Sequence, residues 1–262
     1  MDVRLEQFPN LCMPDPQLSM PERDALGNLT GPRYSSDRFA RIRKRRYSTV
    51  AITNCLKGNQ RHISPGVSLA ALDLLLKLNP YVLEMRGNYP FVDPFRPIGW
   101  SLPPLVDCML TIELLSNPGQ PHLHALFVTE SRMTRLETVL SARGVTVELV
   151  DVRSISKVAL HNAARCYQTL LGLDITVLKT EARHFARILL ANHKRFLADD
   201  LTLDEGMHEM AATVGCGFEH AFNLLCTAHA YGFVQIDPTH RFLPYRPLIL
   251  KESYHEPQTV PL

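Results

Sequence analysis

The chain has 262 residues, of which 45% are hydrophobic and 21% charged, and its formal net charge at pH 7 is +2. This composition is ordinary for a soluble globular protein of one large or two modest domains, and the net charge alone does not indicate a nucleic-acid partner. No apolar run approaches the roughly 20 residues that span a bilayer, and the first ten residues lack the apolar region of a signal peptide. The six cysteines are scattered, without the paired spacing of a zinc site, and are predicted to be reduced. The sequence thus predicts a cytoplasmic protein without a membrane partner.

The N-terminal part is predicted to be an extended, partly disordered basic arm over residues 1–48. Residues 1–32 are rich in proline, asparagine and glycine, and residues 33–47 form the densest positive block of the chain, with interleaved aromatic residues. This block is either a solvated charged segment or a DNA-contacting patch whose cations neutralise phosphates. The candidate DNA-binding residues are Arg38, Arg41, Arg43, Lys44, Arg45 and Arg46.

Residues 49–175 are predicted to form the first folded domain. A strand at 49–53 precedes a helix at 67–78 and a strand at 81–86. Two short apolar, β-branched-rich runs then follow, 106–115 and 122–130, separated by the turn formers of 116–121. A helix at 132–142 and a strand at 145–150 complete the series. The pattern predicts an α/β fold, in which helices flank a mixed sheet with the two-run hairpin at its centre.

Asp107 is the acid in this domain that most needs an explanation. It lies early in an apolar strand, and ionised carboxylates are seldom fully buried without a partner. One interpretation is a carboxylate near a strand end that is solvated or caps a loop. The other is the metal-binding aspartate of a nuclease fold, because carboxylate oxygens are the ligands that magnesium and calcium prefer.

Residues 176–250 are predicted to form a helical linker and a winged helix, followed by a tail at 251–262. Helices are expected at 158–171 and 180–197, from a cap at Asp204 to about residue 214, and at 218–231. A small hairpin is expected to pair 233–236 with 241–243 across a turn at 237–240. The last helix carries no Lys or Arg, which favours a docking or structural role over direct DNA reading. The candidate docking residues are Phe218, His220 and Asn223.

The order of elements resembles that of one family, the TnsA subunit of heteromeric cut-and-paste transposases. The local likeness is carried by the segment 62–91 with its string VLEMRGNYP, by the hairpin and the helix–strand unit that follows it, and by the segment 213–250 with its string YGFV. The resemblance implies a restriction-endonuclease-like domain followed by a C-terminal winged helix. It also implies DNA at transposon ends, a transposase subunit and a regulator ATPase as partners, and magnesium-dependent cleavage of DNA.

The family's catalytic pattern is matched at one position. The resemblance places its aspartate at Asp107, its glutamine at Phe127 and its lysine at Thr129, and neither of the last two side chains can replace the expected group. The helix glutamate falls near residues 68–69, where there is no acid, so Asp73, one turn further on, is the candidate for a displaced carboxylate. Glu113 shares the Asp107 face but lies about 20 Å along the strand.

Three functions follow as hypotheses. The first is a non-catalytic TnsA-like subunit that keeps the fold, binds DNA and docks on its partners, with no cofactor. The second is an active endonuclease with a rearranged site, in which Asp107, Asp73 and an unplaced basic residue act with Mg²⁺. The third is a winged-helix DNA-binding regulator, which predicts a homodimer and a specific operator.

Overall fold

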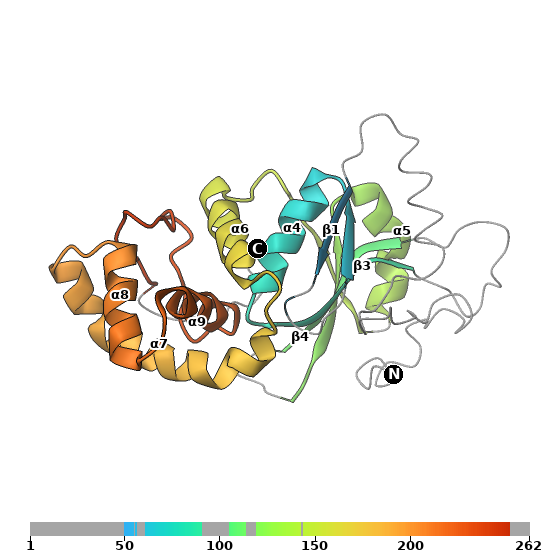
Figure 1. Ribbon diagram of the computed structural model, residues 1–262. Helices are drawn as coiled ribbons and strands as arrows, with labels where there is room; N and C mark the ends of the chain where they lie inside the picture. The colour runs from blue at the N-terminus through green and yellow to red at the C-terminus, as the bar shows by residue number, and fades with distance from the viewer. Residues whose placement is uncertain are drawn as a thin grey trace. The chain divides into compact units, whose positions relative to one another are not determined.

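The chain folds into an α/β structure (Figure 1), known from a computed structural model. No helix in the described part of the chain has the length and apolar character to cross a membrane. The contacts divide the chain into two compact units, residues 1–73 with 82–153 and residues 74–81 with 154–262. The structure describes residues 50–54, 56, 61–90, 105–113, 119–142 and 144–251.

The first unit begins with a two-stranded sheet, in which β1 (Val50–Asn54) pairs antiparallel with β2 (Arg61–Pro65). The polar composition of β2 carries no strand signal in the sequence, so this pairing was not predicted. Helix α4 (Val67–Leu78) follows directly and has the predicted bounds, and its residues up to Asp73 belong to this unit.

The main sheet of the first unit has four strands in the order β3-β4-β5-β6. Strand β3 (Val82–Pro90) pairs antiparallel with β4 (Leu105–Ile112), and β4 pairs antiparallel with β5 (His122–Phe127). Strand β6 (Thr146–Leu149) lies parallel to β5. The predicted mixed sheet is therefore confirmed, and the two apolar runs of the hairpin are its two inner strands.

Helix α5 (Glu130–Ser141) connects the parallel strands β5 and β6 and covers one face of this sheet. Its buried residues Leu136 and Leu140 pack with Met109 of β4 and Phe127 of β5 in one apolar cluster. This face therefore contains little water, and any polar side chain that points into it must find a partner in the protein.

Besides the end of α4, the described part of the second unit contains four complete helices: α6 (Lys157–Leu170), α7 (Ile175–Ala198), α8 (Leu203–Val214) and α9 (Phe218–Ala230). Helix α9 contacts the other three, and Figure 1 shows it between them. The burial of α9 follows from its composition, which has apolar residues on most of its surface.

Helix α8 has clear start and stop signals. Thr202 and Glu205 form a capping box at its beginning, and Gly215 ends it with a left-handed backbone conformation, φ 74°. A left-handed residue favours glycine because a Cβ atom would be strained there. The predicted cap of this helix, Asp204, is therefore wrong, because Thr202 is the residue that caps it, whereas the predicted end near residue 214 agrees with the observed one.

The predicted return strand at 241–243 is wrong. Ile236 instead forms an antiparallel bridge with Leu250, and the Lys251 amide donates to the Gln235 carbonyl at 2.8 Å. The reason lies in helix α6, where the buried side chain of Asn162 accepts a hydrogen bond from the Phe242 amide at 2.8 Å. That amide is consequently not available to a neighbouring strand.

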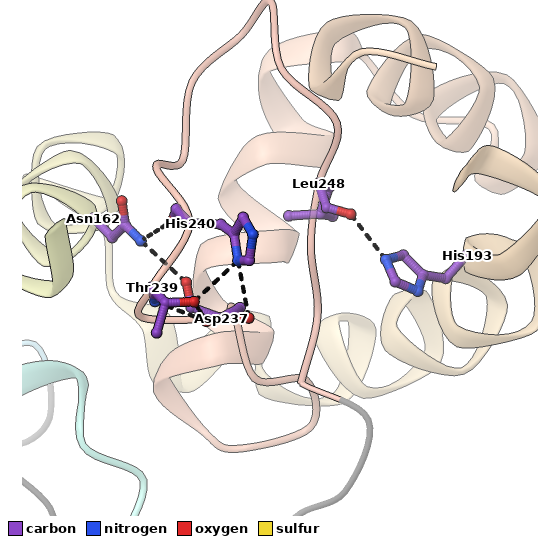
Figure 2. Close-up of polar contacts among 6 residues, drawn as sticks. All are labelled: Asn162, His193, Asp237, Thr239, His240 and Leu248. Carbon is purple, nitrogen blue, oxygen red and sulfur yellow. Dashed lines mark hydrogen bonds and ion pairs between the residues drawn. The ribbon is translucent and has the colours of Figure 1, made fainter. Parts of the chain in front are cut away.

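Asn162 holds the whole turn that precedes Phe242 (Figure 2). Its amide nitrogen donates to the carbonyl oxygens of Asp237, at 3.4 Å, and His240, at 2.8 Å. After this turn, the Leu248 carbonyl oxygen is contacted by the His193 ring of α7 at 2.9 Å, as Figure 2 also shows. Two helices therefore fix the path of the extended segment after α9 through side chain–backbone hydrogen bonds.

Candidate functional site

The strongest candidate site from the sequence, Asp107, lies on an inner strand of the main sheet. The antiparallel register of β4 and β5 pairs Cys108 with Leu126 and Met109 with Ala125. Extending this register by one residue places Asp107 across from Phe127, at the end of β5 where α5 begins. The hairpin therefore brings the three positions matched to the family's aspartate, glutamine and lysine to one end of the sheet.

The Asp107 side chain is completely buried, with an exposed fraction of 0%. One of its oxygens, Oδ2, accepts a hydrogen bond from the Val128 amide at 3.0 Å. The other, Oδ1, forms an ion pair with the guanidinium of Arg132, from the first turn of α5. Each carboxylate oxygen thus has a donor, which is the condition under which an ionised carboxylate is tolerated in a dry interior.

These contacts tie three elements together. Asp107 belongs to β4, Val128 directly follows β5, and Arg132 lies in the first turn of the helix that covers the sheet. Arg132 keeps 43% of its side chain exposed, so its aliphatic part and its charge reach from solvent to the buried carboxylate. The arrangement is that of a structural anchor at the strand–helix junction.

A magnesium ion does not fit the Asp107 site as it stands. Magnesium requires oxygen ligands with accessible lone pairs and is strongly repelled by a cation in contact with its ligand. Here both oxygens are buried and hydrogen-bonded, one of them to a guanidinium. Moreover, the described residues contain no cluster of three or more acidic, histidine or cysteine side chains that could hold a metal.

The neighbouring positions add no catalytic group. Phe127 is fully buried in the apolar cluster under α5. Thr129 is exposed and is the N-cap residue of α5, but its side chain makes no capping hydrogen bond. Its carbonyl oxygen instead accepts from the Arg132 amide at 3.0 Å. Thr129 therefore contributes a backbone acceptor to the first turn of α5 and no catalytic side chain.

Two further acids weighed in the sequence analysis, Asp73 and Glu113, are not partners of Asp107. Asp73 is buried on α4 and is not among the hydrogen-bond or ion-pair partners of Asp107 in the described ranges. Glu113, just after β4, accepts a hydrogen bond from the Gly119 amide at 2.5 Å. Glu113 therefore stabilises the turn of the central hairpin at the end opposite Asp107.

The candidate docking residues lie on the first half of α9. Phe218 stacks on His208 with ring centroids 4.0 Å apart, and His220 contacts the Glu181 carboxylate of α7 at 2.9 Å. Asn223 is half-buried. Two of the three side chains thus have partners within the second unit, and their contacts join α9 to α8 and α7.

The candidate DNA-binding residues Arg38, Arg41, Arg43, Lys44, Arg45 and Arg46 lie outside the described residues. Their assignment remains a prediction from sequence.

One histidine of the main sheet has a strongly shifted pKa. Burial within β5, and secondly the repulsion of nearby His122, lower the pKa of His124 to about 4. The Nδ1 atom of His124 is buried and has no hydrogen-bond partner in the described region. His124 is therefore neutral at physiological pH, and protonating it would weaken the sheet.

Sequence reasoning missed Arg132 as the partner of Asp107. A signal for it exists, because a cation in the first turn of a helix opposes the helix dipole and calls for a nearby anion. Asn162 carried no such signal, since its partners lie 75 to 80 residues away in the chain.

Comparison with known proteins identifies no family for this chain: no protein-family model matches it, and no curated protein matches it. The functional argument therefore rests on the residues and contacts described above.

Proposed function

We propose that this protein is a TnsA-like DNA transposition subunit that has kept a restriction-endonuclease-like scaffold and lost DNA cleavage. In this role it binds DNA at transposon ends and docks on a partner transposase and a regulator ATPase. The observation that carries the proposal is the burial of Asp107 with a donor on each carboxylate oxygen. An acid committed in this way supports the sheet, and its burial and its contact with a guanidinium disfavour binding of a catalytic metal.

The architecture supports the scaffold part of the proposal. An antiparallel pair of inner strands followed by a helix and a parallel strand is the arrangement that the family resemblance predicts. In the proposal, α8 and α9 are the two helices of a winged helix, and the segment Gly215–Gly217 is the turn between them. The bridge between Ile236 and Leu250 is then the base of its wing, with a longer loop than the sequence suggested.

The DNA-binding part of the proposal rests on the basic segment at 43–46. Replacing Arg43, Lys44, Arg45 and Arg46 by Ala should weaken binding to duplexes of any sequence, because each cation that neutralises a phosphate releases a counterion. It should also flatten the dependence of log K on log salt by about 0.9 for each phosphate that is no longer neutralised. Fluorescence anisotropy over a salt series measures both quantities, and unchanged binding and slope would remove this segment from the proposal.

A second candidate function is an active endonuclease, and one contact favours it. The rearranged site needs a basic residue near Asp107, and Arg132 is in contact with that carboxylate. For cleavage, Arg132 would have to release Asp107, and further ligands would have to approach. Metal-dependent nicking of DNA distinguishes this function from the first.

A further inference from the structure

Helix α7 carries a row of cations on its exposed side that no function above explains. The row runs at intervals of four, four, three and four residues, and residues at such intervals share one face of a helix. All its members are exposed, and the one apolar member, Leu190, is 51% exposed. The row, called the α7 stripe below, consists of Lys179, Arg183, Arg187, Leu190 and Lys194.

The cations of the stripe have no acidic partners in the described part of the chain. Three acids near α7 pair with other residues: Glu181 with His220, and Asp199 and Glu209 with Arg195. Asp174, the N-cap residue of α7, accepts hydrogen bonds from Thr176. The stripe cations therefore form no ion pair with the described residues of the second unit.

Two of the cations are held in place by aromatic rings that follow α9. The Lys179 ammonium lies 4.9 Å from the centroid of the Tyr231 ring, and the Arg183 guanidinium lies 4.9 Å from that of Phe233. The two rings stack on each other with centroids 6.0 Å apart. Such cation–π contacts restrict long side chains, so less conformational entropy remains to be lost when the cations bind an anion.

The shape of the stripe fits a linear polyanion. From Lys179 to Lys194 it extends about 22 Å along a rigid helix, at 1.5 Å per residue. Duplex DNA presents one charge per about 1.7 Å of axis, so a duplex laid along the stripe meets each cation with a phosphate nearby. A membrane surface fits less well, since a membrane-bound helix inserts an apolar face. The apolar face of α7 is already buried, through Ala182, Phe185 and Leu189.

We propose that the α7 stripe is a second DNA-backbone contact, which holds duplex DNA through its phosphates without reading its sequence. This inference rests on the proposed DNA-binding function and adds to it a surface in the folded part of the chain. The stacked rings of Tyr231 and Phe233 position Lys179 and Arg183 at one end of the stripe. The one stripe position without a cation is occupied by Leu190, which adds no negative charge.

The test compares the full-length protein with a stripe variant in which Lys179, Arg183, Arg187 and Lys194 are changed to Gln. Binding to a labelled random-sequence duplex is measured by anisotropy over a salt series. The matched control removes two lysines and two arginines that lie outside the stripe in the same unit: Lys157, Arg241, Arg246 and Lys251, each to Gln. Both variants lose four positive charges, so the comparison isolates position from net charge.

The stripe variant should bind at least about tenfold more weakly than the control variant, with a salt slope lower by about 2 to 4. Equal binding by the two variants would overturn the proposal that the α7 stripe contacts DNA, and would leave the proposal of DNA binding through residues 43–46 unaffected. A wild-type protein that does not bind the duplex at all would overturn both proposals.

Two further experiments separate loss of the DNA contact from misfolding and from membrane binding. A charge-conserving variant, in which each Lys of the stripe becomes Arg and each Arg becomes Lys, should bind nearly as the wild type does, even if the Gln variant folds poorly. Loss of binding in this variant, with its circular dichroism spectrum unchanged, would contradict a simple phosphate contact. Stripe-dependent binding to phosphatidylserine vesicles with no binding to the duplex would replace DNA by a membrane surface.

Discussion

At the scale of single residues, the account depends on the ion pair between Asp107 and Arg132. Burying a carboxylate is costly unless it is paired and hydrogen-bonded, and removing one partner of such a pair destabilises more than removing both. Asp107 satisfies this condition with a guanidinium and a backbone amide. The physical role of the residue is thus fixed by its neighbours, whatever role an aspartate at this position has in related folds.

The first prediction concerns the stability of Asp107 variants. Asp107→Ala removes the acceptor of the Val128 amide and the partner of Arg132, and should lower the free energy of unfolding by about 1–3 kcal/mol. Asp107→Asn keeps an acceptor for the amide and should cost less. Arg132→Gln leaves a buried charge with one donor and should cost more than Asp107→Asn. Denaturant unfolding measures all three, and an Asp107→Ala protein as stable as the wild type would contradict the anchor.

The second prediction concerns pH and His124. Its pKa is about 4 in the folded chain, against an ordinary value of 6.5, so between these values the unfolded chain binds more protons. The contribution of neutral His124 to stability is therefore complete above about pH 6.5 and is lost as the pH falls towards 4.

The wild type should accordingly lose more stability between neutral pH and pH 4 than a His124→Gln variant does. Denaturant unfolding at a series of pH values measures this difference. His122→Gln, a change at an exposed neighbour, removes only the smaller cause of the shift and should recover a small part of the loss. Parallel pH profiles for wild type and His124→Gln would refute the assignment.

At the scale of elements, the sequence predicted what local pattern determines. The helix at 67–78 has the predicted bounds. The end of α8 was predicted because a left-handed glycine marks it, but its cap is Thr202 and not the predicted Asp204. The bounds of α9 agree with the predicted ones within one residue. The main sheet was predicted because its inner strands lie in short apolar runs that are separated by turn residues. Strand β2 was missed because its polar residues carry no alternating apolar pattern.

Contacts between residues far apart in the chain could not be predicted from the sequence. The return strand at 241–243 was wrong because Asn162 of α6 takes up the Phe242 amide. Likewise, the environment of Asp107 depends on Arg132, 25 residues away. Local pattern marks Arg132 as a cation in the first turn of a helix but does not say which anion it meets. The sequence therefore located Asp107 but not the partners that determine its chemistry.

The third prediction tests the Asn162 contact. Asn162→Ala leaves the Phe242 amide and the carbonyl oxygens of Asp237 and His240 without this partner, and should cost about 2–3 kcal/mol. Hydrogen exchange should show faster exchange of the Phe242 amide, together with a lower unfolding midpoint.

The matched control for that variant is Asn192→Ala. Asn192 also donates from a half-buried helical position, but only to the Ile188 carbonyl of its own helix, at 2.9 Å. Its loss should cost less than about 1 kcal/mol. Equal effects of the two substitutions would show that Asn162 does not fix the turn.

At the scale of the whole molecule, the proposed function combines a nuclease-like scaffold without DNA-cleaving activity with two DNA-binding surfaces. The first is the basic segment at 43–46, and the second is the α7 stripe. Because both surfaces act through phosphates, binding should depend strongly on salt and little on sequence. Sequence-specific cleavage or reading would in this account come from the partner proteins.

The most direct test is a nicking assay on supercoiled plasmid with Mg²⁺ or Mn²⁺, comparing the wild type with Asp107→Ala and Asp107→Asn. Because the Asp107 carboxylate is fully buried and paired with Arg132, the account predicts no metal-dependent nicking by the wild type above the level of either variant. Metal-dependent nicking by the wild type that disappears in the folded Asp107→Asn protein would contradict it and establish an active endonuclease.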